Sequence, residues 1–157
     1  MQERALVEAG YRYALSLTHR ETDAEDLVQE AWLKVYQRRG RRFDKALFFT
    51  AIRNLYIDQY RRNKLVVLEP LDESQVADSH DFGSDISMAD LEPALASLRP
   101  EEREAIFLNS VEGYTVRQIA EFTQRPRGTV LSLIHRGKQK MAAKLRRLWG
   151  DTGEQSA

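Results

Sequence analysis

Basic and hydroxyl side chains that could contact DNA are concentrated in the stretch from Thr115 to Lys140. Val130, Ile134 and Met141 recur there at helical spacing and predict an apolar stripe that faces a core. The side chains off this stripe suit phosphates and base edges, and they are Arg127, Thr129, Ser132, His135, Arg136, Lys138 and Lys140. The solvated face of any helical hairpin could carry the same residue types, so the pattern alone makes DNA binding a hypothesis.

Two short helices joined by a tight turn would position these side chains. Thr115 and Gln118 form a capping box, in which each side chain satisfies a free backbone N–H, and so they predict where the first helix starts. Pro126 suits the first position of the second helix because it lacks a backbone donor and has a preset φ. Small Ala120 allows the two helices to cross closely. This order predicts a helix-turn-helix, whose second helix enters the major groove of DNA.

A second set of cations lies in the first half of the chain, around a predicted loop at Gly40 and along a predicted helix from about residue 44 to 63. The polar residues of this set are Arg38, Arg39, Arg41, Arg42, Arg53, Asn54, Asp58, Arg61 and Arg62. The same helix carries Phe49, Tyr56 and Tyr60. Aromatic rings interleaved with arginines suit the stacking of unpaired bases, whereas aromatic residues at helical spacing more often belong to a core. Both interpretations stay open.

An acidic helix precedes this set. Thr22 and Glu25 form a second capping box and predict a helix from there to about residue 39. Its apolar stripe comprises Leu27, Val28, Ala31, Trp32, Val35 and Tyr36, and the polar residues Asp26, Gln29, Glu30 and Lys34 lie away from it. Acids near the start of a helix and arginines beyond its end also suit the helix dipole. The polar residues therefore indicate either a binding surface or helix stabilisation.

Composition narrows the classes of function. The chain of 157 residues has no cysteine, which excludes disulfides, thiolate chemistry and cysteine zinc sites. It has no apolar run as long as a membrane span and does not open like a signal peptide, so we expect a cytoplasmic protein with no membrane insertion. The 24 basic and 24 acidic residues balance, but the stretch from Lys64 to Glu92 holds eight acids against one base. Two basic lobes therefore flank an acidic connector.

The chain is expected to be all-α, because no stretch predicts a convincing strand. Residues 1–64 form one small domain of three helices, over about 3–19, 22–39 and 44–63. Residues 65–87 form an acidic flexible linker without sustained periodicity. Residues 88–150 form a second domain of four helices, of which the first spans about 86–98 and the second starts at Pro100 and ends near Gly113. Residues 151–157 are expected to be a frayed tail.

With both halves considered, the sequence resembles the extracytoplasmic-function (ECF) sigma factors of bacterial RNA polymerase. The segment DAEDLVQEAWLKVYQ is similar to the family's polymerase-binding helix, and IRNLYIDQYRR is similar to its promoter-melting helix. The segment LRPEEREAIFLNSVEGYTVRQIAEFTQRPRGTVLSLIHRGKQKM resembles the domain that reads the upstream promoter element. The resemblance implies a region 2-like domain followed by a region 4-like domain, and a function in promoter recognition, DNA melting and transcription initiation.

The resemblance also implies a role for each polar set. Asp26, Gln29, Glu30 and Lys34 would face core RNA polymerase, and the arginine loop with the third helix would hold the melted strand. The upstream element would meet the outward residues of the helix-turn-helix, with Arg125 and Leu131 among them. Core polymerase and promoter DNA, as duplex and as melted single strand, are the implied partners, and an anti-sigma factor is left open as a further one. No cofactor, metal ion or catalytic residue is implied.

Four positions near the turn of the helix-turn-helix depart from the family pattern. The family usually has glycine at Gln124, an aliphatic residue at Arg125, and arginines at Leu131 and Leu133. Gln124 is therefore expected to take a left-handed conformation, at a cost of about 1 kcal/mol. Leu131, which lies off the predicted apolar stripe, could touch a thymine methyl group. The third helix also lacks the tryptophan that the family commonly has near Leu47.

Two other classes of function were weighed. A helix-turn-helix regulator that acts without polymerase would leave the acidic helix and the melting-like helix unexplained, and no dimerisation heptad is visible. A metal-dependent nuclease could be built on His19, Glu21, Asp23 and Asp26. Capping and the helix dipole explain those acids more simply, because their spacing does not supply the converging ligands that a metal needs.

Overall fold

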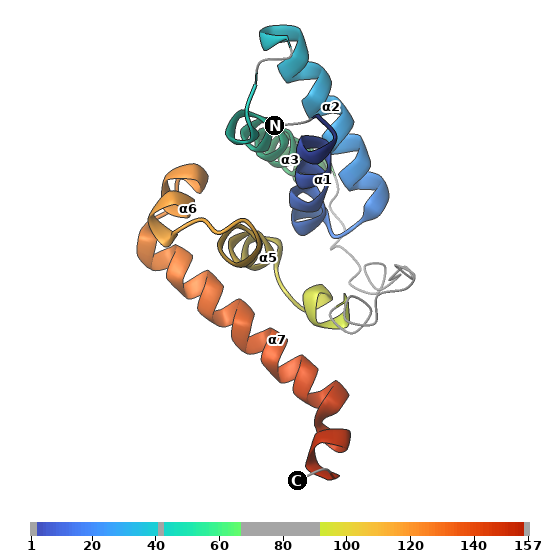
Figure 1. The fold of residues 1–157 in the computed structure, drawn as a ribbon, viewed down its shortest axis with the longest axis vertical. Coiled ribbons are helices and arrows are strands. Elements are labelled where there is room, and N and C mark those ends of the chain that lie inside the picture. The colour runs from blue at the N-terminus through green and yellow to red at the C-terminus, as the bar shows by residue number, and fades with distance from the viewer. Residues whose placement is uncertain (1–2, 41–42, 67–91, 156–157) are drawn as a thin grey trace. The chain divides into compact units, whose positions relative to one another are not determined.

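The computed structural model describes residues 3–40, 43–66 and 92–155. Within these ranges the regular elements are helices throughout, which confirms the all-α prediction (Figure 1). The chain divides into two compact units, Met1–Leu71 and Asp72–Ala157. Arg41, Arg42 and nearly all of the predicted linker lie outside the described residues.

The first unit is a bundle of three helices, α1 (Glu3–Thr18), α2 (Glu21–Arg39) and α3 (Lys45–Val66). The three largest of its fully buried side chains are aromatic. Tyr13 of α1 and Phe49 of α3 are fully buried and stack with their ring centroids 4.6 Å apart. Phe48 is also fully buried, and it packs edge to face against Trp32 at 5.5 Å and Phe43 at 5.9 Å.

The junction of α1 and α2 differs from the prediction. The capping box of Thr22 and Glu25 is wrong, because α2 begins at Glu21 and its N-cap residue is Arg20. His19 breaks the helix with a left-handed φ of 55°. The Thr18 hydroxyl then accepts a hydrogen bond from the Arg20 backbone N–H at 3.2 Å. The N-cap therefore lies two residues earlier than predicted, and Thr22 falls inside the first turn of α2.

Helix α3 begins close to its predicted start and ends later than predicted. At its start the Asp44 carboxylate accepts a hydrogen bond from the Leu47 backbone N–H at 3.0 Å, which caps the helix. At its end α3 continues to Val66, past the predicted limit at residue 63 and into the first residues assigned to the linker.

The second unit contains a helical turn at residues 92–96, α5 (Pro100–Ile106), the π-helix η2 (Phe107–Val111), α6 (Val116–Thr123) and α7 (Arg127–Gln155). The Glu102 carboxylate accepts a hydrogen bond from the Arg99 backbone N–H at 2.9 Å and caps α5. Gly113 follows η2 with a φ of 78°, in agreement with the predicted helix end. Residues 151–155, assigned to the tail by the prediction, continue α7.

The core of the second unit joins α5, α6 and α7. Leu108, Ile119 and Val130 are fully buried there. Leu133 is also buried, with 4% of its surface exposed, although the family usually has an arginine at this position. Gly137 of α7 lies against Ile106, so that α5 and α7 pack closely.

Candidate functional sites

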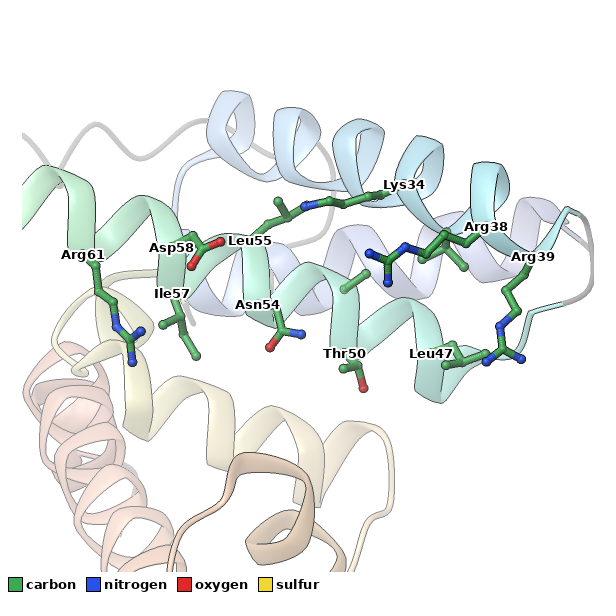
Figure 2. Close-up of a pocket in the computed structure, with 12 residues that line it drawn as sticks. Lys34, Arg38, Arg39, Leu47, Thr50, Asn54, Leu55, Ile57, Asp58 and Arg61 are labelled. Atoms are coloured by element: carbon green, nitrogen blue, oxygen red, sulfur yellow. The ribbon is translucent and has the colours of Figure 1, made fainter.

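A cationic pocket of about 650 Å³ lies between α2 and α3 (Figure 2). Four of its lining residues, Lys34, Val35, Arg38 and Arg39, belong to α2, and the other eight belong to α3. The residues that line it are Lys34, Val35, Arg38, Arg39, Leu47, Thr50, Ala51, Asn54, Leu55, Ile57, Asp58 and Arg61. Four cations thus surround an apolar floor that also carries an amide, a hydroxyl and one carboxylate.

Helix geometry produces this arrangement. The lining residues of α3 recur at intervals of three and four, which places them on one side of the helix. On α2, Arg38 follows Lys34 by one turn, and Gly40 then ends the helix with its backbone N–H bonded to the Tyr36 carbonyl at 2.7 Å. The cations therefore gather at the C-terminal end of α2, where their charge also suits the helix dipole.

The pocket brings together five residues of the set predicted to bind melted DNA, namely Arg38, Arg39, Asn54, Asp58 and Arg61. Arg53 and Arg62 do not line it, and Arg53 is half-buried. Lys34, which was predicted to bind polymerase, also lines this pocket. The volume lies within the range of about 300–1,000 Å³ that is typical of ligand pockets, and seven of the twelve lining residues are polar or charged.

The three aromatic residues of α3 that were considered for base stacking have different surroundings. Phe49 belongs to the core, so the stacking interpretation is wrong for this residue. Tyr60 is 48% exposed, and its ring lies 6.3 Å from that of the half-buried Tyr56, with an interplanar angle of 30°. Of these three residues, Tyr56 and Tyr60 keep rings that a base could reach.

The acidic side of α2 forms a separate surface. Asp26, Gln29 and Glu30 are exposed. Leu33 is also exposed, with 59% of its surface accessible. It follows Asp26 by seven residues, or two helical turns, and therefore lies in line with Asp26 between Gln29 and Glu30. The sequence analysis overlooked Leu33, although its position off the apolar stripe of α2 was a usable signal.

The helix-turn-helix forms as predicted. The Gln118 backbone N–H donates to the Thr115 hydroxyl at 3.1 Å, and the Thr115 backbone N–H donates to the Gln118 side chain at 2.9 Å, which confirms the capping box. Gln124 has the expected left-handed conformation, with φ 59° and ψ 42°. The Pro126 carbonyl then accepts from the Val130 backbone N–H at 3.1 Å and opens α7.

The two sides of α7 separate clearly. Val130 and Ile134 are buried. The exposed residues of the predicted upstream-element set are Arg127, Thr129, Leu131, Ser132, His135, Arg136 and Lys138. Arg136 Nε donates to the Ser132 carbonyl at 3.3 Å, which holds its guanidinium along the helix surface. These side chains remain available to a ligand.

Two other members of that set point inward. Arg125 Nη1 lies 3.2 Å from Glu104 Oε1, and Lys140 Nζ lies 2.9 Å from Glu102 Oε1. Burial raises the pKa of the Glu102 carboxyl, but the hydrogen bond from the Arg99 backbone and the Lys140 ammonium outweigh this effect and hold the pKa below its usual value. Arg125 and Lys140 thus serve the core of the second unit, a role that the sequence analysis missed.

Among the residues that the structure describes, no group of three or more histidine, cysteine or acidic side chains could hold a metal ion. The same part of the chain contains no helix with the length and hydropathy to cross a membrane.

Comparisons with known proteins match both units. The Sigma-70 region 2 family model matches residues 4–66, and the Sigma-70 region 4 family model matches residues 89–141. The sigma factor RpoE from Bartonella quintana, solved in complex with the anti-sigma factor NepR, superposes with a TM-score of 0.69 at 26% identity, covering 91% of this chain and 93% of that one.

Curated relatives give the same result. The ECF RNA polymerase sigma factor SigE of Mycolicibacterium smegmatis is 33% identical over 142 residues, which cover 83% of this chain and 55% of that protein. SigL of Mycobacterium tuberculosis, also an ECF RNA polymerase sigma factor, is 31% identical over 134 residues, which cover 80% of this chain and 76% of that protein. The chain therefore spans about half the length of the first relative and about three quarters of the second. With region 2 and region 4 matched in order, this chain belongs to the ECF RNA polymerase sigma factors.

Proposed function

We propose that this protein is a sigma subunit that binds core RNA polymerase, directs it to a promoter and assists in opening the DNA. The observation that carries this proposal is the cationic pocket in the unit matched by region 2, together with the exposed face of α7 in the unit matched by region 4. A regulator acting alone would need only the second of these. As a partner of polymerase the protein would act in the cytoplasm, through binding and without a catalytic step of its own.

The acidic surface of α2 is the proposed contact with core polymerase. Its carboxylates favour a basic partner, because complementary charge steers association and fixes its register. Leu33 supplies the apolar centre that such a surface needs, and Asp26, Gln29 and Glu30 form its polar rim.

This contact is tested by charge reversal. The double change Asp26→Lys and Glu30→Lys should weaken binding to core polymerase and leave the helical circular-dichroism signal unchanged, because both side chains are exposed. Leu33→Ala should weaken binding as well, by about 1–2 kcal/mol. Glu8→Lys, which alters an exposed carboxylate of α1, is the matched control and should bind normally. Equal binding of the double variant and the parent would refute the assignment.

The pocket between α2 and α3 is the proposed site for one nucleotide of the melted strand. The four cations suit its phosphates, while Asn54 and Asp58 offer a donor and acceptors to a base edge. Since unpaired bases are needed for such contacts, this site should prefer single-stranded over duplex DNA.

The exposed face of α7 is the proposed reader of the upstream element. Residues near the start of a recognition helix reach base edges, and residues farther along more often meet phosphates. Arg127 and Ser132 are therefore assigned to base reading, and Lys138 to a phosphate. Leu131, with 56% of its surface exposed, suits a thymine methyl group.

Run-off transcription with purified core polymerase tests the proposal as a whole. Across a promoter library, polymerase with this protein should start transcripts at defined sites, and core polymerase alone should not. A regulator acting without polymerase would bind duplex DNA and start no transcript. Because the solved RpoE structure contains the anti-sigma factor NepR, a protein of that class is the further partner that we propose to test.

A further inference from the structure

Three consecutive charged residues of α5 are buried. Glu102, Arg103 and Glu104 expose 1%, 7% and 2% of their surfaces. Successive residues of a helix point about 100° apart, so each of the three faces a different neighbour. Glu102 pairs with Lys140 of α7, Arg103 donates to the Leu98 carbonyl at 2.8 Å, and Glu104 pairs with Arg125.

The pair between Glu104 and Arg125 reaches the turn of the helix-turn-helix. A carboxylate with 2% of its side chain exposed is stable as an anion only when cations or donors face it, and Arg125 supplies a cation at 3.2 Å. The Arg125 side chain is 26% exposed and its guanidinium faces Glu104, so it is directed largely into the protein and away from a ligand.

The same residue is also held through its backbone. The Arg125 N–H donates to the Ala120 carbonyl of α6 at 3.0 Å. The side chain thus ties the turn to α5, and the main chain ties it to α6. The preceding residue, Gln124, is left-handed without being glycine, a conformation that persists only where the surroundings impose it.

We propose that Arg125 and Glu104 are positioning residues, which fix the turn and thereby aim the first turns of α7 at DNA. Arg125 does not contact DNA in this scheme. The inference rests on the proposed function, since it assigns a role within the same DNA-reading unit. It also explains why an arginine can stand where the family usually has an aliphatic residue, because Glu104 gives it a buried partner.

Four variants of the full-length protein test this role. Arg125→Met and Glu104→Gln each break the pair, while Arg125→Lys keeps the positive charge. Arg117→Met is the matched control, because it removes an arginine of α6 whose pair with Glu121 is exposed on both sides, at 77% and 73%.

Each variant is assembled with core polymerase and titrated with the duplex that the unaltered protein selects from a random pool. At a temperature where all variants are folded, Arg125→Met and Glu104→Gln should bind about tenfold more weakly, as expected for coupled residues. The double variant should bind no more weakly than either single one, Arg125→Lys should recover part of the loss, and Arg117→Met should bind like the parent. The dependence of affinity on salt should stay unchanged in all of them.

Amide hydrogen exchange of the full-length protein gives a readout that needs no DNA. Exchange of the Arg125 and Val130 amides should be faster in Glu104→Gln and Arg125→Met than in the parent, and Arg117→Met should leave it unchanged. Unchanged exchange in the first two variants would overturn the inference. Unchanged DNA affinity in these two variants would also overturn it. The same holds if the dependence of log affinity on log salt concentration falls by about one unit in Arg125→Met, because such a fall indicates a lost phosphate contact. A parent protein that selects no duplex would instead refute the proposed function.

Discussion

Substitution of Gly10 by alanine should destabilise the first unit through a single buried contact. A Cβ atom at Gly10 would lie 2.3 Å from Phe48 Cε2 and 2.9 Å from Phe48 Cζ. Carbon atoms normally approach to about 3.5 Å, so the backbone or the ring must move by roughly 1 Å. The ring has little freedom to do so, because it is fully buried and packs against Trp32 and Phe43.

Two opposing effects determine how much Gly10→Ala changes the free energy of unfolding. Alanine is favoured over glycine inside a helix by roughly 0.5–1 kcal/mol. Inserting a methyl group into a filled core costs about 1–3 kcal/mol. We therefore expect Gly10→Ala to lower the free energy of unfolding by about 1–2 kcal/mol. For a unit of this size the Tm should fall by roughly 5–15 °C.

Calorimetry of the full-length protein, with the other helical glycines as controls, measures this effect. Gly128 has no atom within 4 Å of an added Cβ, so Gly128→Ala should not destabilise the protein. At Gly137 the nearest atom, at 2.4 Å, is the terminal methyl group of Ile106, which can rotate away, so Gly137→Ala should have a smaller effect than Gly10→Ala. If Gly10→Ala were as stable as the parent, the idea that the Phe48 ring is fixed would be refuted.

Three further predictions follow from the second unit and the connector. Ser132→Ala should change which upstream sequences are selected from a promoter library, because each lost base contact costs about 1–3 kcal/mol of binding free energy. Lys138→Ala should instead weaken binding to all sequences alike and lower the salt dependence of binding. Identical library profiles for the two variants would contradict this division. Lys140→Met should reduce stability at neutral pH by about 1–2 kcal/mol in urea unfolding, a value discounted because the Lys140 side chain is 41% exposed. The pKa of Glu102 is lowered in the folded state, so the stabilisation is complete above the pKa of an unfolded glutamate, about 4.3, and is lost as the pH falls through the folded pKa. The free energies of unfolding of the parent and Lys140→Met should therefore converge in acid. A difference between them that stays constant with pH would contradict this prediction. Limited proteolysis should cut first within residues 65–87, and earlier cutting inside α2 or α7 would argue against a linker there.

Local chemistry alone determined several features of this protein. The capping box of Thr115 and Gln118 and the glycine after η2 depend on residues within a few positions of each other, so the sequence predicts them directly. The apolar stripe through Val130 and Ile134 is equally local, because helical periodicity decides which residues share a side. A local capping pattern was misleading at Thr22. The pattern was present there, but the turn at His19 started the helix earlier.

The tertiary structure decided which polar side chains remain available. Arg125 and Lys140 have the composition of a DNA-binding face, but their carboxylate partners lie 21 and 38 residues away along the chain. The periodicity of this stretch cannot show that α5 packs against α7 and turns two glutamates toward Arg125 and Lys140. The pocket has the same origin, since Arg38 and Asn54 face one cavity only because α2 packs on α3. Side-chain type follows from the sequence, whereas the pairing of charges distant along the chain depends on how the helices pack.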